Sequence, residues 1–360
     1  PIEGLNPAEF ELFNMGLDDF LEVEDGEEGL GPIFNGRSCA ECHSVPSIGG
    51  SGTIMEIRAG RRNEDGSFTE FPPGSVFQMF SLPPHGCQKL VPSDANVFSR
   101  RKSLPIFGDG LIEAIPDETL LARAAANEAH PDQIGGRAHI VLDVFTNRLR
   151  VGRFGWKAQQ ATLMTFGAEA YRDEMGITND LFGSEAIVYA DERQERDCDP
   201  RPDPEDVRDR TTRLRGIDNF ANFMRMLGPP PRGERTSLSA AGELIFEQIG
   251  CAACHVPEMT TGQAVQAVLS RKPVPLFSDL LLHDIGAGDG LPQDDASGDE
   301  FRTTPLWGLR VRAPLMHDGR AATILDAIRM HERQAGASRR RFEALSDVDR
   351  AALLEFLRTL

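Results

Sequence analysis

The order of apolar and polar residues predicts a chain built mainly of helices and loops. Near the C-terminus, apolar side chains recur at positions i, i+3, i+4 and i+7, namely Leu353, Phe356, Leu357 and Leu360. This spacing places them on one face of a helix. The segment from Ser346 to Asp349 resembles a capping box, so we expect the helix to begin there.

Turn residues and alternation predict the remaining organisation. Residues 138–151 alternate enough to form a β-hairpin. Residues 60–75 and 286–300 are rich in Gly and Asp and are expected to be loops. Residues 191–215 are dense in Asp, Glu, Arg and Pro, which indicates an exposed insertion. The run 228–233 breaks any helix with three consecutive prolines between glycines, and we place a domain boundary at this connector.

Composition narrows the class of protein. The chain has 360 residues, of which 40% are hydrophobic, so it can build a packed core. Its net charge of −18 disfavours nucleic acid binding. The charge fits a locally cationic redox partner, and it equally fits a role in solubility alone. No apolar run is long enough to cross a bilayer, and no signal peptide is visible. Because the sequence begins at Pro1, we expect a processed or trimmed product.

Two copies of Cys-x-x-Cys-His, residues 39–43 and 251–255, are the most specific chemical signal. This pentapeptide is the attachment site of c-type haem. Two thiols add to the haem vinyl groups, and the adjacent histidine becomes the proximal iron ligand. The expected attachment residues are Cys39, Cys42, Cys251 and Cys254, and the expected proximal ligands are His43 and His255. The alternatives are a thioredoxin-like redox pair or a zinc site, but zinc would need further Cys or His at close spacing.

The haem motifs also predict a compartment. Covalent haem attachment in bacteria takes place outside the cytoplasmic membrane, so we expect a periplasmic protein. In that oxidising environment the two remaining cysteines, Cys87 and Cys198, are expected to form a disulfide. Two separate buried thiols are the alternative, because the sequence does not give their distance.

The regions around the two motifs resemble each other, which predicts two diverged cytochrome c modules. Phe34 and Phe246 each lie five residues before the first cysteine of a motif, and we align them. We therefore expect a mainly α fold with two cytochrome c-like haem domains, long loops and a small β-hairpin insertion. Residues 1–232 would carry the reactive haem, and residues 233–360 the electron-transfer haem.

A helix is predicted ahead of the second motif. Ser237 or Ser239 can cap it, it would run to about Ile249, and Gly250 would end it. Its apolar residues are expected to face the haem, namely Leu244, Ile245 and Phe246. The C-terminal helix would pack across it, as is common in cytochrome c domains.

The group opposite each proximal histidine decides the chemistry. A haem with two protein ligands carries electrons, whereas an open side can bind and activate a small oxidant. Met316 lies 61 residues after His255, a usual separation in a cytochrome c module, and we expect it to be the sixth ligand of the second haem. The adjacent His317 is a rival, and a role for Met316 as core filler is the alternative.

The same offset from His43 falls at Leu104, with no Met close in sequence, so we expect the first haem to lack a thioether ligand. Glu113 lies in the corresponding region among apolar neighbours. A carboxyl on the distal side could move protons during O–O cleavage. The alternative is a structural Glu paired with an Arg. His85 is either a displaceable ligand in a resting form or a loop histidine.

These residues resemble the bacterial di-haem cytochrome c peroxidase and MauG superfamily. The run 304–320 is similar to the segment that supplies the Met ligand in those peroxidases. Closer still is the branch called di-haem oxidoreductase or putative peroxidase, sometimes labelled thiol oxidoreductase. That branch is similar in the runs 34–43, 110–116, 152–158 and 281–286. The likeness spans nearly the whole chain.

The resemblance implies a peroxide-reactive N-terminal haem and a His/Met C-terminal haem that relays electrons. It implies a calcium ion between the domains, for which the carbonyls of Thr303 and Pro305 are candidates. It also implies a Trp between the haems. Trp156 and Trp307 are the candidates, and neither lies in the Trp-Asp-Gly-Arg context of the peroxidases.

We therefore expect a periplasmic di-haem redox enzyme that uses hydrogen peroxide or another small oxidant, with Glu113 as the acid–base group. The reductant would be a small redox protein or a residue on a protein substrate. A non-enzymatic carrier with two six-coordinate haems is the main alternative. An oxygen-using di-haem oxidase, dioxygenase or thiol oxidase is the other.

Overall fold

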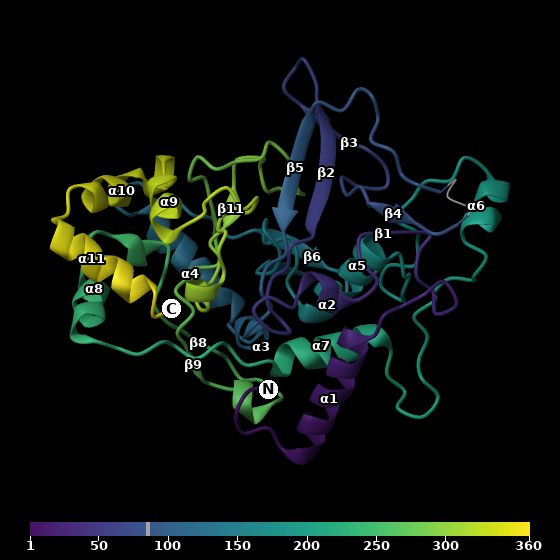
Figure 1. Cartoon of the computed structure of the whole chain (residues 1–360), viewed down its shortest axis with the longest axis horizontal. Coiled ribbons are helices and arrows are strands. Elements are labelled where there is room, and N and C mark those ends of the chain that lie inside the picture. Colours follow the sequence, from purple (N-terminus) through teal and green to yellow (C-terminus); the bar gives the residue numbers. More distant parts are fainter. Residues whose placement is uncertain (84–86) are drawn as a thin grey trace.

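The computed structural model describes residues 1–83 and 87–360. Figure 1 shows α8 to α11 together at one end of the molecule, while the remaining helices, the short strands and the loops form the rest. The helices before the connector are α1 (Pro7–Leu21), α2 (Cys39–Cys42), α3 (Asp109–Glu113), α4 (Asp117–Glu128), α5 (Leu163–Met175), α6 (Glu192–Cys198) and α7 (Gly216–Met226). Those after it are α8 (Ser237–Gln248), α9 (Ile324–Arg329), α10 (Gly336–Glu343) and α11 (Asp347–Leu357). Among the described helices, none is both long and apolar enough to cross a membrane.

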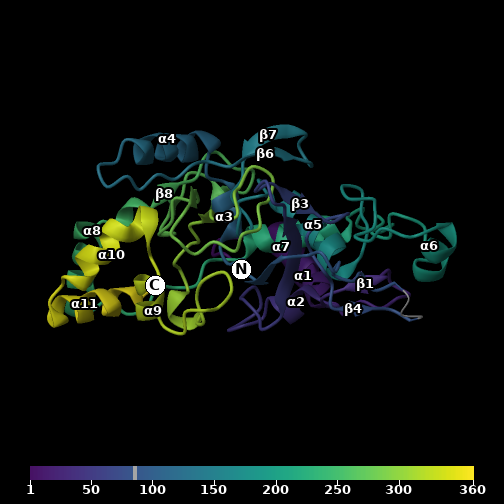
Figure 2. The ribbon, with the colours of Figure 1, turned by 90° about the horizontal axis from the view of Figure 1, so that it is seen from above.

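The strands form small antiparallel sheets. The largest has the order β3-β2-β5, and the others are two-stranded. The strands are β1 (Ile33–Phe34), β2 (Met55–Arg62), β3 (Phe68–Glu70), β4 (Phe80–Ser81), β5 (Val97–Lys102), β6 (Ile140–Asp143), β7 (Arg148–Val151), β8 (Met259–Thr260), β9 (Pro273–Val274), β10 (Leu282–His283) and β11 (Phe301–Arg302). The pairing of β6 with β7 confirms the predicted hairpin, and Figure 2 shows it beside α4 along one edge.

The first motif is preceded by a helix that crosses α7. A methyl group at Gly16 of α1 would overlap the carbonyl oxygen of Asn219 and lie 2.9 Å from Cβ of Phe223. Only glycine therefore allows this close approach. One turn later, the ring of Phe20 packs on Phe223 with a centroid separation of 4.7 Å.

The second motif has the same arrangement in α8 and α11. A methyl group at Gly242 would overlap the carbonyl oxygen of Ala352 and lie 2.8 Å from Cβ of Phe356. The ring of Phe246 lies 5.2 Å from that of Phe356. Glycine and phenylalanine are four residues apart in both α1 and α8, so the two helix pairs correspond.

This correspondence corrects the alignment of Phe34 with Phe246. The structural counterpart of Phe246 is Phe20, because Phe34 lies in β1 and packs on Phe80 at 5.8 Å. Residues 22–38 separate α1 from the first motif, whereas α8 ends just before the second. Spacing to the cysteines is therefore not preserved between the modules.

The helices of the second module are largely as predicted. Ser346 caps α11 by accepting a hydrogen bond from the backbone N–H of Asp349. The N-cap of α8 is Thr236 rather than Ser237 or Ser239, so that prediction is wrong by one residue. Of the three residues predicted to face the haem, Phe246 lines the cavity at the second motif. Leu244 is 68% exposed, and neither it nor Ile245 belongs to the described wall of that cavity.

The connector at residues 228–233 lies where α7 has ended and α8 has not begun. The larger apolar core nevertheless combines N-terminal side chains with residues beyond the connector, including Val256, Leu276 and Leu281. A second core comes wholly from the C-terminal part. The division into 1–232 and 233–360 therefore stays a prediction, with part of the second segment packed on the first.

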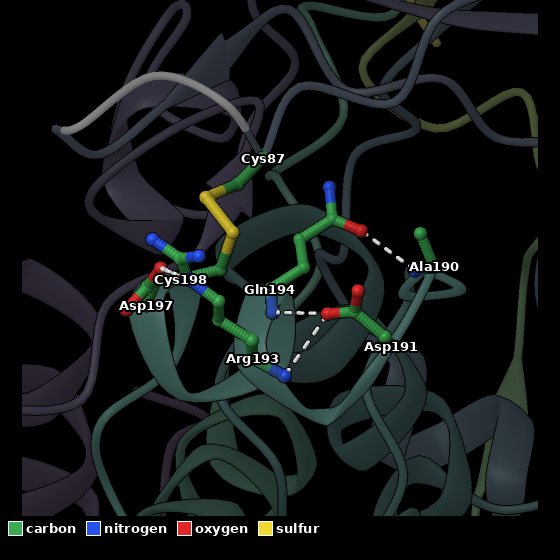
Figure 3. Close-up of a disulfide and its surroundings, with 7 residues drawn as sticks. All are labelled: Cys87, Ala190, Asp191, Arg193, Gln194, Asp197 and Cys198. Carbon is green, nitrogen blue, oxygen red and sulfur yellow. Dashed lines mark hydrogen bonds and ion pairs between the residues drawn. A yellow bond between two sulfur atoms is a disulfide. The ribbon is translucent and has the colours of Figure 1, made fainter.

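A disulfide between Cys87 and Cys198 confirms the predicted pairing, with Cα atoms 5.7 Å apart (Figure 3). Cys198 ends α6, which Asp191 caps by accepting hydrogen bonds from the N–H groups of Arg193 and Gln194. The bond ties the charged insertion to a segment 111 residues earlier in the chain. Closing so long a loop lowers the entropy of the unfolded chain and so favours the folded state.

Candidate haem-binding cavities

Each Cys-x-x-Cys-His motif opens into a cavity. The first cavity, of about 190 Å³, is lined by Cys39, Cys42 and His43. The second cavity, of about 210 Å³, is lined by Cys251, Cys254 and His255. Apolar side chains form much of both walls, including Phe20, Ile106 and Phe220 in the first and Phe246, Leu309 and Phe342 in the second. Such walls suit the broad apolar faces of a haem.

Short helical turns place the two thiols of each motif together. Cys39 and Cys42 begin and end α2, and Cys251 opens a 3-10 turn after Gly250. Residues three apart in a helical turn lie on the same side. Burial raises the pKa of Cys39, Cys42 and Cys251 to about 12, so these groups are neutral thiols. A thioredoxin-like pair needs a readily formed thiolate, which this environment opposes.

Both motif histidines have one ring nitrogen held by a backbone carbonyl. His43 Nδ1 lies 3.0 Å from the carbonyl oxygen of Gly50, and His255 Nδ1 lies 3.2 Å from that of Phe277. A carbonyl only accepts, so Nδ1 carries the proton and Nε2 keeps a free lone pair, as a metal ligand requires. Burial lowers the pKa of both imidazoles, that of His255 to about 4 with repulsion from His331 added. These residues fit a covalently attached haem in each cavity.

Among the potential iron ligands in the wall of the second cavity, His283 is already engaged through both ring nitrogens, Nδ1 with the carbonyl oxygen of Ile134 at 3.1 Å and Nε2 with Asp279 at 2.8 Å. Three further candidates remain for the iron's other side. They are Met316, His317 and His331. The ring of His331 lies 6.3 Å from that of His255, and its Nδ1 bonds the carbonyl oxygen of Ala327 at 2.7 Å. The sequence interpretation missed His331. It lies 76 residues after His255, and its only local signal is a histidine following a short helix.

The first cavity presents carboxyl groups and the cationic side chains of Arg58, Arg101 and Lys102 instead. Among the described residues, its wall contains no imidazole besides His43. The acidic groups are Glu56, Glu169, Asp173 and Glu174. Arg58 pairs with Glu56 at 2.5 Å and donates to Ser75 Oγ at 2.7 Å. Burial opposes its charge, but the surrounding carboxylates outweigh that effect and raise the pKa of Arg58.

Two of these acids can carry a proton near neutral pH. Burial, followed by repulsion from Asp173, raises the pKa of Glu169 to about 7. Burial, followed by repulsion from Glu56, raises the pKa of Glu174 to about 8. Glu174 also accepts a hydrogen bond from Asn35 at 2.7 Å, which holds its carboxylate. Glu169 is held in a similar way by a hydrogen bond with the Gln160 side chain. Of the two acids, Glu169 has the lower pKa and is therefore the better proton acceptor near neutral pH.

Two methionines also reach the first cavity, although none is close to Leu104 in sequence. They are Met175 at the end of α5 and Met224 on α7. Met224 packs against α5, with its Cε 3.2 Å from the position of a Cβ on Gly167. No Met lies close to Leu104 in the sequence, as predicted. Folding nevertheless brings two thioethers from distant parts of the chain to the wall of the first cavity.

Glu113 lies elsewhere. Its carboxylate pairs with Arg225 at 2.6 Å and accepts the N–H of Leu163, at the start of α5, at 2.7 Å. It is absent from the walls of both cavities as far as the described residues define them. This geometry favours the structural alternative, a Glu paired with an Arg. His85 lies outside the described residues.

One tryptophan lies in the wall that the cavities share. Trp156 lines both, as does the segment 102–104, and its Nε1 donates to the carbonyl oxygen of Lys102 at 2.7 Å. Its ring meets those of Phe301 and His317 edge-on at about 6 Å. Trp307 lines neither cavity in the described structure and instead packs beside Gly108. Trp156 is therefore the tryptophan placed between the two sites.

The candidate calcium carbonyls already have hydrogen-bond partners. The carbonyl oxygen of Thr303 accepts from Ser278 at 2.6 Å, and that of Pro305 accepts from the Arg312 guanidinium at 3.0 Å. A cationic guanidinium beside Pro305 would repel a second cation. This arrangement gives no support to a calcium ion held by these two groups.

Comparison with known proteins gives a family. Residues 87–360 match the family described as "Di-haem oxidoreductase, putative peroxidase". A search of curated proteins finds no match.

Solved structures give distant matches. The diheme peroxidase BthA from Burkholderia thailandensis matches at 16% identity and a TM-score of 0.44, over 99% of this chain and 86% of that chain. Hydrazine synthase from Kuenenia stuttgartiensis matches at 17% identity and a TM-score of 0.42, over 100% and 88%. A MauG-like protein associated with microbial copper homeostasis matches at 17% identity and a TM-score of 0.35, over 78% and 94%. Similarities this distant carry no argument about activity.

Proposed function

Because the chain belongs to the di-haem oxidoreductase, putative peroxidase family, we propose that it is a c-type di-haem enzyme that reduces hydrogen peroxide or another small oxidant. Cys39 and Cys42 would hold the first haem, and Cys251 and Cys254 the second. His43 and His255 would be the proximal ligands. The observation that carries the proposal is the difference between the cavity walls, which contain carboxyl groups at the first motif and further imidazoles at the second.

The first cavity is the proposed reaction site. A haem with an open axial side supplies an iron that can bind and reduce a peroxide. The Glu169 carboxylate would take the proton from the peroxide O–H and return it to the departing oxygen. The Arg58 guanidinium would stabilise the negative charge that develops during cleavage of the O–O bond. Neither step needs Glu113, which is held by Arg225.

The second cavity is the proposed entry point for electrons. A haem there with two protein ligands would exchange electrons but not bind substrate. Trp156 would couple the two cavities, because it lies in the wall of both. The reductant would be a small redox protein or a residue on a protein substrate, and the net charge of −18 favours a cationic docking face. Periplasmic location follows from covalent haem attachment and is part of the proposal.

A calcium ion remains a proposal from the family resemblance alone. Metal analysis of the purified protein tests it directly. Because Thr303 and Pro305 are engaged with protein donors, a bound ion would use other ligands.

Peroxide consumption by the fully haem-loaded, reduced protein tests the proposed activity. We expect turnover with peroxide that exceeds turnover with oxygen and thiols. Glu169→Gln should reduce it, whereas Glu113→Gln, a matched loss of one carboxylate, should not. Faster turnover with oxygen or thiols would favour the oxidase alternative instead.

A non-enzymatic carrier is the second candidate, and the two methionines of the first cavity are the observation that favours it. A sulfur on the first iron would close the reactive side. Met175→Leu and Met224→Leu should leave the spectrum of the first haem unchanged if the enzyme proposal holds. Conversion of that haem from low to high spin in either variant would establish the carrier.

A further inference from the structure

Two imidazoles face the same space in the second cavity. The ring centroids of His255 and His331 are 6.3 Å apart, and the ring planes differ by 49°. Two imidazoles that bind one metal ion from opposite sides, each through a bond of about 2 Å, have ring centres about 6 Å apart. The separation therefore leaves room for one iron between the rings.

Both rings have the tautomer that ligation requires. His255 Nδ1 bonds the carbonyl oxygen of Phe277, and His331 Nδ1 bonds that of Ala327. Each carbonyl fixes the proton on Nδ1 and leaves Nε2 with its lone pair. Both rings therefore keep the free lone pair on the same nitrogen.

The backbone fixes the position of His331. It follows α9, whose N-terminus has a capping box formed by Thr323 and Asp326. The backbone N–H of His331 bonds the carbonyl oxygen of Ile328 at 3.1 Å. A side chain held by its own helix terminus can bind a metal with little loss of conformational freedom.

The neighbouring candidates have different surroundings. The ring of His317 stacks on Phe301 with centroids 4.2 Å apart and planes 11° apart, and it also meets Trp156 edge-on. Met316 lines the cavity beside the apolar core of the C-terminal helices. A haem iron has one axial position left after His255 binds. Occupation of that position by His331 therefore excludes Met316.

We propose that His331, and not Met316, is the second axial ligand of the haem attached at Cys251 and Cys254. The inference rests on the proposed function for the presence of that haem. A thioether raises the potential of a haem relative to a second imidazole. The relay haem therefore has a lower potential than a His/Met centre, and its physiological reductant belongs to a correspondingly low-potential class.

The first test is a spectrum of the fully loaded wild-type protein. Near-infrared magnetic circular dichroism distinguishes bis-imidazole from imidazole–thioether ligation in the low-spin ferric state. We expect a bis-imidazole signal from the second haem. A thioether signal that disappears in Met316→Leu would overturn the assignment.

The second test uses His331→Met with Met316→Leu as its matched control. His331→Met should introduce a thioether signal and shift the potential of the second haem upward. Met316→Leu should change neither property. His331→Ala should convert the second haem to a high-spin form that binds carbon monoxide. An unchanged low-spin second haem in loaded His331→Ala would contradict the inference.

Haem attachment and the axial ligand of the second haem can be tested separately. Mass spectrometry of the peptides containing the motifs reports whether both haems are attached, independently of their axial ligands. Loss of haem at residues 251–255 in the wild-type protein would defeat the proposed function. If both haems are attached and the protein turns over peroxide, but Met316 binds the second haem, only the assignment of His331 is wrong.

Discussion

The two cavities share a scaffold and differ in the wall that faces the proximal histidine. In each, a Gly and a Phe four residues apart let one helix cross another, and the Phe ring lies 6.3 Å from the motif histidine. The second cavity then offers an imidazole from the segment that follows α9, whereas the first offers carboxylates from β2 and α5. The helix pair thus gives the two motif histidines similar surroundings, and the segments between each motif and its closing helix supply the side chains that differ.

Removal of one motif histidine should have the largest effect, and it should distinguish the peroxide reaction at the first haem from electron entry at the second. His43→Ala should abolish peroxide turnover, because the reactive iron loses its ligand and the first core loses its haem. His255→Ala should preserve the reaction of the first haem with peroxide but abolish sustained turnover from an external reductant. Stopped-flow spectra of both variants check this. Equal loss of the first peroxide reaction in the two variants would show that the sites are not functionally distinct.

Loss of the proposed acid–base group should have the next largest effect. Glu169→Gln keeps the size of the side chain but cannot transfer a proton in the same way, so the rate constant for peroxide should fall by roughly 10²-fold or more. Glu113→Gln is the control. It weakens the bond to Arg225, which should cost about 1.5–3 kcal/mol of unfolding free energy while leaving the peroxide rate near normal. The reverse pattern would return the catalytic role to Glu113.

The pH dependence should sharpen the same assignment. Glu169 must be deprotonated to accept a proton, and burial raises its pKa to about 7. The peroxide rate constant should therefore rise with pH through the neutral region and level off above it. Below the pKa, the rise should be at most about tenfold per pH unit. Glu169→Gln should flatten this profile. A neutral-region transition that persists unchanged in the variant would point to another group, with Glu174 next.

Substitution of the glycine at either helix crossing should have a smaller effect, of similar size at the two sites. Gly16→Ala and Gly242→Ala each force a methyl group into the backbone of the partner helix, at a cost of about 1–3 kcal/mol in unfolding free energy. Each should loosen its own haem site more than the other. Gly74→Ala serves as the control, because a Cβ there meets no atom within 4 Å. Chemical denaturation followed at each haem measures the difference, and no destabilisation by either crossing variant would reject the shared scaffold.

The sequence could predict features that depend on local pattern. The haem motifs, the hairpin at residues 138–151 and the capped C-terminal helix all follow from spacing within a few residues. The disulfide of Cys87 and Cys198 followed from elimination, since the motifs use the other cysteines.

The sequence could not predict contacts that depend on long-range packing. His331 and His255 are brought together by folding of the segment between them, and Glu169 reaches the first cavity through α5, far from His43 in the chain. The alignment of Phe34 with Phe246 failed because residues 22–38 separate α1 from its motif. Offsets counted from a motif are informative only where no such segment intervenes.

Carbon monoxide titration of the fully reduced di-haem protein tests the difference between the cavities most directly. The account predicts that one haem binds the ligand and that the other keeps its low-spin spectrum. His43→Ala should then remove the carbon monoxide-binding haem, and His255→Ala should leave it in place. Binding at neither haem would identify an electron carrier, and binding at both would show that no side chain closes the second cavity.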